Sequence, residues 1–215
     1  MPNWITTQVT APKHVIEAMT NESGHIDFTK IMPFPGPRDE WDGICCIAEE
    51  AAEIVCSVPV SDHPLVAALE RSNRANFDIK KLNDESFIQF VGMLENYRAC
   101  GYLHSMDFNR KAWGTKWNAC ESKIVDGTAS FETAWGCPEP VLTALSKSFP
   151  GDEINVTYAD EDIGSNCGTF TLKGGEITQS DIAPSWRDQT PEDKTKWKAF
   201  AYKVKGWDPK DDDEE

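Results

Sequence analysis

The sequence of 215 residues predicts an α+β fold from three observations. Near the amino terminus, apolar and polar residues alternate with the period of two that a half-buried strand requires. Residues 38–106 instead show the 3.6-residue period of helices. Two β-prone runs then flank Asp126-Gly127, a dipeptide typical of a hairpin turn. Strand runs and helical runs in this arrangement are the α+β pattern.

The first 37 residues predict a strand, a short helix and a second strand. Trp4 to Thr10 is rich in β-branched residues, and Pro12 is placed to begin a helix. The second strand is expected at His25 to Ile31. The proline-rich segment Met32 to Pro37 then leaves the sheet, because proline can neither continue a ladder nor enter a helix interior.

Residues 38–106 predict a helical insert with three helices. The first has an apolar stripe from Trp41 to Val55, and the second runs from Asp62 to about Ser72. The third begins at Asp84 and stops at Gly101. Its inward face is expected to hold a larger apolar set, namely Phe87, Phe90, Val91, Leu94 and Tyr97.

The segment Trp113 to Trp135 predicts a hairpin at the centre of the sheet. By alternation, Phe131, Thr133 and Trp135 should face inward. A helix is predicted after Cys137, and further strands after it complete the sheet. Thr190-Pro191 then begins a terminal helix that carries Trp197 on its apolar stripe.

With the insert removed, the elements follow the order of a ferredoxin-like β-α-β-β-α-β sandwich with extra strands. We therefore expect a ferredoxin-like α+β domain at 1–37 and 107–180, interrupted by the helical insert at 38–106. A C-terminal helix extension should occupy 181–207, and a disordered acidic tail 208–215.

Several segments together resemble the YubB-type ferredoxin-like family of phage and plasmid proteins. They are Met1 to Trp4, Phe28 to Pro35, W-G-T-K-W-N-A at 113–119, F-E-T-A-W at 131–135, and Phe149-Pro150 followed by Tyr158. The resemblance covers about residues 1–180. It implies the same fold and a role in evading host defence, and it carries over no catalytic residue. Gly136-Cys137-Pro138 departs from the Pro-Pro pair that is more usual there.

The net charge of -15 argues against non-specific nucleic-acid binding and against docking on anionic membranes. It suits a basic protein partner, or serves solubility alone. We expect no signal peptide at the amino terminus and no apolar run long enough to span a membrane. Seven cysteines without a C-x-x-C pair indicate reduced thiols, and hence a cytoplasmic protein.

Three groups of residues are candidates for binding a partner. Trp113, Lys116 and Trp117 could form the rim of an aromatic pocket, or the tryptophans could belong to the core. The carboxylates of Asp160, Glu161 and Asp162 could imitate a phosphate backbone, or could form a solvated loop. Finally, the helix with Trp197 could pack between two copies of the chain as a homo-oligomer.

No complete catalytic or metal site is present in the sequence. Cys100 and His104 have helical spacing, and other cysteines lie near His63, but no set matches a structural zinc pattern. No G-x-S-x-G elbow is present either. We therefore expect no cofactor, no metal and no catalytic residue.

The sequence thus favours a non-enzymatic, acidic interaction protein of a phage or plasmid. Its partner would be a host protein, such as a nucleic-acid-binding defence protein, and its role counter-defence of the anti-restriction or anti-CRISPR kind. The alternative is a small-molecule-binding protein or enzyme with a pocket near W-G-T-K-W.

Overall fold

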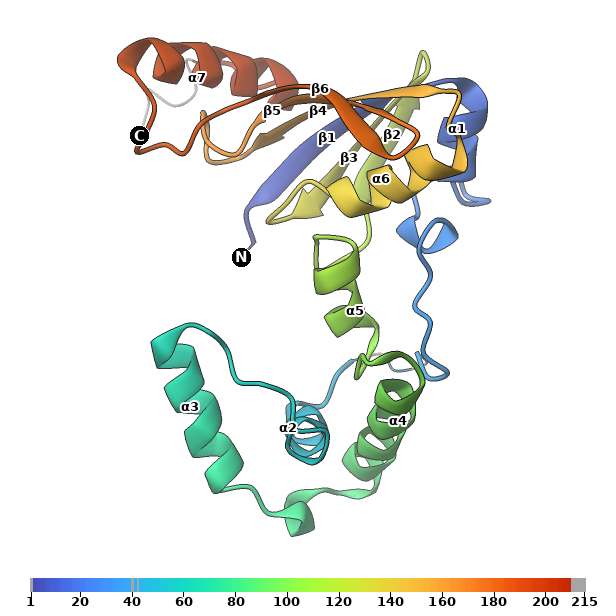
Figure 1. Cartoon of the computed structure of the whole chain (residues 1–215), viewed down its shortest axis with the longest axis vertical. Helices are drawn as coiled ribbons and strands as arrows, with labels where there is room; N and C mark the ends of the chain where they lie inside the picture. Colours follow the sequence, from blue (N-terminus) through green and yellow to red (C-terminus); the bar gives the residue numbers. More distant parts are fainter. Residues whose placement is uncertain (1, 40, 42, 210–215) are drawn as a thin grey trace. The chain divides into compact units, whose positions relative to one another are not determined.

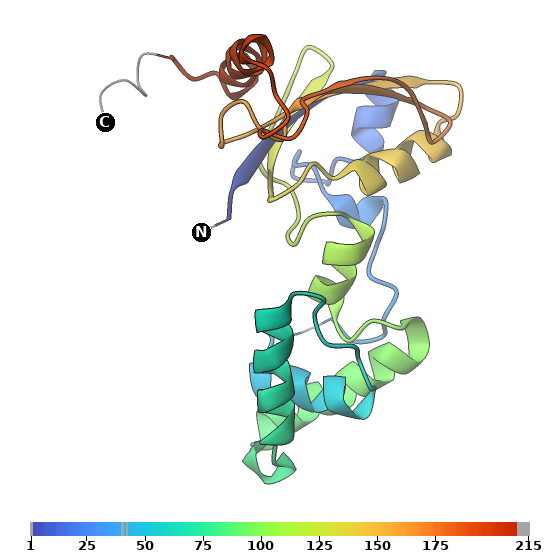
Figure 2. The same cartoon turned by 60° about the vertical axis from the view of Figure 1, so that its left-hand side comes forward.

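A computed structural model describes residues 2–39, 41 and 43–209 of the chain. Most of the predicted acidic tail at 208–215 lies outside the described residues, as do Met1, Glu40 and Asp42. The chain divides into two compact units, Met1–Pro33 with Asn109–Glu215, and Phe34–Phe108 (Figure 1, Figure 2). The first is called here the sheet unit and the second the helical unit.

The sheet unit is built on six antiparallel strands in the order β2-β3-β1-β4-β5-β6. The strands are β1 (Trp4–Thr10), β2 (Cys120–Val125), β3 (Thr128–Ala134), β4 (Glu153–Asp160), β5 (Gly168–Lys173) and β6 (Glu176–Ile182). With α1 (Lys13–Ala18) and α6 (Glu139–Ser148), the chain order from β1 to β4 is β-α-β-β-α-β. This confirms the predicted ferredoxin-like class, and β5 and β6 are the extra strands.

The two faces of the sheet are covered differently. Ile5, Val9 and Phe131 are buried on the face that carries the main core, as are Val15 of α1 and Leu142 of α6. Strand residues that point the other way are mostly polar. The long terminal helix α7 (Pro191–Lys205) packs on this second face, where the Gln8 side chain donates to the Val204 carbonyl at 3.2 Å.

The helical unit contains α2 (Cys46–Val55), α3 (Pro64–Ala75) and α4 (Asp84–Cys100), and the helix α5 (Ser105–Ala112) crosses its boundary. Its core is small: Ala48, Ala51, Ala52, Phe90, Met93 and Leu103. Arg74 of α3 forms an ion pair with Glu53 of α2 at 3.1 Å. Among the described residues, no helix combines the length and apolar character needed to cross a membrane.

Two of the predicted elements are wrong. His25 to Ile31 is not a strand: Phe28–Lys30 forms a 3-10 turn, because the Asp27 carboxylate accepts from the Thr29 backbone N–H at 3.0 Å. The first helix of the insert begins at Cys46 rather than near Trp41.

The hairpin forms with Asp126-Gly127 as its turn, but it does not lie at the centre of the sheet. β2 is an edge strand, whereas the amino-terminal β1 lies between β3 and β4. The tryptophans of this segment lie outside the two strands, since Trp113 and Trp117 precede β2 and Trp135 follows β3.

Candidate functional site

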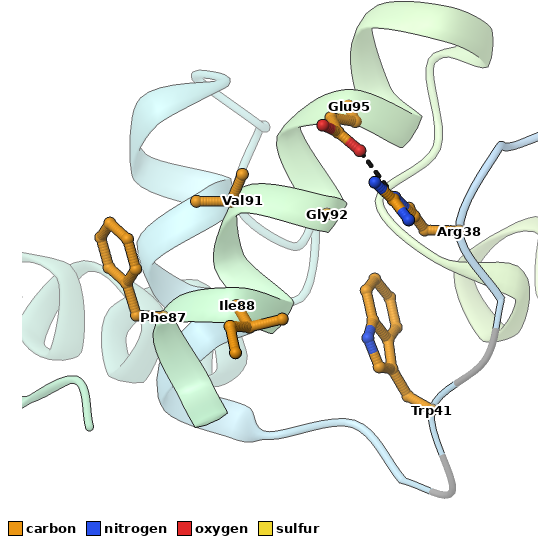
Figure 3. A pocket seen from close by; sticks show the side chains of 7 residues that line it. All are labelled: Arg38, Trp41, Phe87, Ile88, Val91, Gly92 and Glu95. Atoms are coloured by element: carbon orange, nitrogen blue, oxygen red, sulfur yellow. Dashed lines mark hydrogen bonds and ion pairs between the residues drawn. The ribbon is translucent and has the colours of Figure 1, made fainter. Parts of the chain in front are cut away.

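An open groove of about 350 Å³ runs along α4 in the helical unit (Figure 3). Phe87, Ile88, Val91 and Gly92 of α4 form one wall, and Trp41 forms the facing wall. An ion pair closes one end, where the Arg38 Nε lies 2.8 Å from Glu95 Oε2. The lining is therefore apolar in the middle and charged at one end.

Two polar side chains of α4 hold the segment that carries Trp41. Gln89 accepts from the Cys45 backbone N–H at 2.8 Å and donates to the Gly43 carbonyl at 3.0 Å. Asn96 accepts from the Arg38 N–H and donates to the Arg38 carbonyl, both at 2.9 Å. The backbone groups of Arg38, Gly43 and Cys45 that a helix would pair internally are therefore paired with side chains of α4.

Glycine at position 92 allows Trp41 to approach the helix closely. A Cβ added there would lie 2.6 Å from the edge of the Trp41 ring. The indole can therefore rest against the α4 backbone, and it forms a fixed wall of the groove.

Apolar side chains are exposed on the outer side of α4, although the side that faces the rest of the helical unit is partly polar. Ser86, Gln89 and Asn96 are buried on its inner side. Phe87 is 48% exposed and Ile88 66% exposed, and Val91 is also exposed. The inward placement predicted for Phe87 and Val91 is therefore wrong. The inner face of α4 thus combines the core residues Phe90 and Met93 with hydrogen-bonding side chains, and further apolar side chains are exposed.

Most of the W-G-T-K-W-N segment has a structural role. Trp113 is buried, and its indole N–H donates to the Met32 carbonyl at 2.9 Å. Thr115 donates to the Ala134 carbonyl at 3.0 Å, and the Asn118 amide donates to Asp27 at 2.8 Å. Trp113 is therefore unavailable for a partner, and of its two predicted alternatives the structure supports a place in the core.

Lys116 and the tryptophans at its side do reach the surface. Trp117 is 39% exposed and Trp135 is 51% exposed. Their ring centroids are 5.6 Å apart, and the centroid of the Trp4 ring lies 6.1 Å from that of Trp117. The inward placement predicted for Trp135 is wrong because its backbone leaves the strand conformation, with φ of 63°.

The acidic loop does not form a row of exposed carboxylates. Asp160 is the last residue of β4 and is 5% exposed. Its carboxylate accepts from the Asn3 and Asn166 amides and from the Asp162 backbone N–H, at 2.9–3.2 Å. Glu161 is half-buried and only Asp162 is exposed. Asp160 thus stabilises the loop, which contradicts its predicted role in phosphate mimicry.

Trp197 is also unavailable at the surface. It is 3% exposed and packs with Ala159, Cys167, Ala201 and Val204 of the same chain. The Trp197 side chain therefore belongs to the core between α7 and the sheet, and packing of α7 between two copies of the chain would have to use other residues of the helix.

The thiols and histidines of the helical unit have ordinary partners. His104 is buried, its Nε2 lies 3.0 Å from Glu49 Oε1, and its Nδ1 accepts from the Asp107 N–H at 3.1 Å. The Cys100 thiol donates to the Asn96 carbonyl. Within the described part of the chain, no group of three or more His, Cys, Asp or Glu residues could hold a metal ion.

The chain is similar to one described family. The family model for the "Ferredoxin-like domain in Api92-like protein" matches residues 112–200, from the end of α5 into α7. A crystal structure of the protein api92 from Yersinia pseudotuberculosis aligns with a TM-score of 0.40 at 12% identity, over 86% of this chain and 99% of that chain. No curated protein matches the sequence.

Proposed function

We propose that this chain is a non-enzymatic interaction protein of a phage or plasmid, and that it binds and blocks a host protein. The resemblance of residues 1–180 to the YubB-type family supports this origin and a counter-defence role, anti-restriction or anti-CRISPR. The partner would be a nucleic-acid-binding defence protein in the cytoplasm of the bacterial host.

The apolar outer face of α4 is the observation that carries the proposal. The helical unit does not need the exposed side chains of Phe87, Ile88 and Val91 in order to fold, because α4 makes its core contacts from its other face. Contiguous exposed apolar side chains beside charged groups are typical of protein interaction sites. The fixed wall formed by Trp41 gives the face a concave shape that a partner segment can enter (Figure 3).

An amphipathic helix of the partner fits this groove best. Helices that bind in grooves insert apolar side chains at i, i+3 or i+4, and i+7, and ridges of this spacing match the i, i+4 pair Phe87 and Val91. Asp84 and Glu85 in the first turn of α4 place negative charge three residues before Phe87 and Ile88 of the groove lining. The partner helix should therefore carry a basic end, and the net charge of -15 should speed its approach.

The test is capture of a partner from host lysate by the full chain, followed by affinity measurement with the purified partner. Ile88→Glu places a carboxylate at an exposed position of the groove. The complex then loses the free energy of burying the isoleucine side chain, so the affinity should fall at least about tenfold. Val125→Glu in β2 is the matched control, because Val125 is exposed to a similar degree, 64% against 66%. It should bind like the unaltered chain.

Two results would count against the proposal. One is recovery of no partner at both low and physiological salt. The other is equal affinity of the Ile88→Glu and Val125→Glu chains, which would place the interface elsewhere. Neutralising Asp84 and Glu85 should slow association and reduce its salt dependence. Unchanged association rates would exclude electrostatic attraction by these two carboxylates.

A further inference from the structure

A second surface, in the sheet unit, already holds a cation against aromatic rings. The Lys116 Nζ lies 4.8 Å from the centroid of the Trp117 ring and 5.9 Å from that of Trp135. An ammonium within about 6 Å of an indole face is attracted by the negative potential of the ring. Two rings act here on one cation, and the Trp4 ring also packs against Trp117, with 6.1 Å between centroids.

The backbone of Trp135 is strained, and this strained conformation positions its ring at the surface. Its φ of 63° is a left-handed conformation that bulky L-residues rarely adopt. The Trp135 N–H donates to the Asn3 carbonyl at 2.8 Å, and Thr133 Oγ1 donates to the Gly136 carbonyl at 2.8 Å. With ordinary strand geometry the Trp135 side chain would continue the alternation of β3 and turn inward. The strained residue instead brings the ring beside Trp117 and Lys116.

We propose that Trp117 and Trp135 bind the guanidinium group of an arginine side chain from a protein partner. Lys116 is the chain's own occupant of the site, and the arginine displaces it. A guanidinium is planar, stacks on aromatic faces and is more weakly hydrated than an ammonium, so it gains more from the rings. The displaced Lys116 head group returns to water on its flexible stem. The net charge of -15 attracts a cationic ligand to the chain.

This site goes beyond the proposed function, because it lies in the other unit and its test needs no host protein. The full chain, with its tryptophan indoles labelled for NMR, is titrated with N-acetyl-arginine amide. The citrulline amide, which has nearly the same shape without the charge, is titrated in parallel. We expect saturable shifts of the Trp117 and Trp135 indole N–H signals with arginine and none with citrulline.

Substitution of the resident cation tests the displacement. Lys116→Gln removes the competitor, so arginine should bind about two- to fivefold more tightly. Lys123→Gln changes an exposed cation on β2 and should leave the affinity unaltered. Trp186 is an exposed indole with two lysine ammonium groups over its ring, Lys194 Nζ at 4.6 Å and Lys198 Nζ at 5.9 Å; it serves as a reference within the same spectrum and should shift less.

Three outcomes would overturn the inference. Equal shifts with citrulline would mean that the indoles bind by apolar contact alone. Unchanged affinity in Lys116→Gln would mean that the lysine does not occupy the site. Equal shifts at Trp186 would mean that arginine associates with any exposed indole.

Discussion

Replacing Asn96 with alanine should release the segment that forms one wall of the groove. The buried amide makes three hydrogen bonds of 2.9 Å, with the Arg38 N–H, the Arg38 carbonyl and the Leu103 carbonyl. Each bond contributes about 1 kcal/mol net, and the Leu103 carbonyl would lose its partner in a buried position. Alanine returns roughly 0.5 kcal/mol through its higher helix propensity. The expected loss of stability in the helical unit is therefore about 2 to 3 kcal/mol.

Native-state hydrogen exchange of the α4 amides measures this loss directly. It is preferable to a single urea transition, because a chain with two compact units need not unfold in one step. Glu95→Ala is the control on the same helix. It removes only the exposed ion pair with Arg38 and should cost less than about 0.5 kcal/mol. A loss below about 1 kcal/mol for Asn96→Ala, or equal losses in both chains, would refute the role given to Asn96.

Three further predictions concern other residues. Asp160→Ala removes the acceptor of three hydrogen bonds and should lower the free energy of unfolding of the sheet unit by about 2 to 4 kcal/mol, whereas Asp162→Ala should change it little; native-state hydrogen exchange of the β4 amides distinguishes them. Gly92→Ala should push the Trp41 ring off α4, so it should weaken partner capture while leaving the thermal midpoint unchanged or raised; no loss of capture would contradict the groove. Burial raises the pKa of Cys167 from 9.0 to about 11, so the stability gained from its neutral thiol is complete below pH 9 and lost as the pH rises towards about 11. Urea midpoints at pH 8 and pH 10 should therefore differ less in Cys167→Ala than in the unaltered chain.

The fold could be predicted because its signals are local. The alternation of Trp4 to Thr10 and the Asp126-Gly127 turn both specify strands that the structure contains. Thr190 and Asp193 form the capping box that the start of α7 requires. Sequence could not exclude a strand at His25 to Ile31, because the turn there depends on the side chain of Asp27 and on Asn118, 91 positions away.

The candidate surfaces were harder to predict, because in both of them the usual relation between polarity and burial is reversed. Apolar periodicity placed Phe87 inward, but the buried Gln89 and Asn96 take the inner face of α4 to bind a neighbouring segment. Alternation placed Trp135 inward, but a single left-handed residue turns it outward. Neither event leaves a pattern in the surrounding residues.

The position of β1 in the sheet has a consequence for the order of events during synthesis. β1 is synthesised before the other five strands, and both its neighbours, β3 and β4, are made more than a hundred residues later. At ~5–20 residues per second, this strand waits on the order of ten seconds without a pairing partner. The helical unit is contiguous in sequence and is completed during that interval. The nascent chain therefore carries an unpaired strand beside a finished helical unit, and this interval is when it is most exposed to aggregation and most dependent on chaperones.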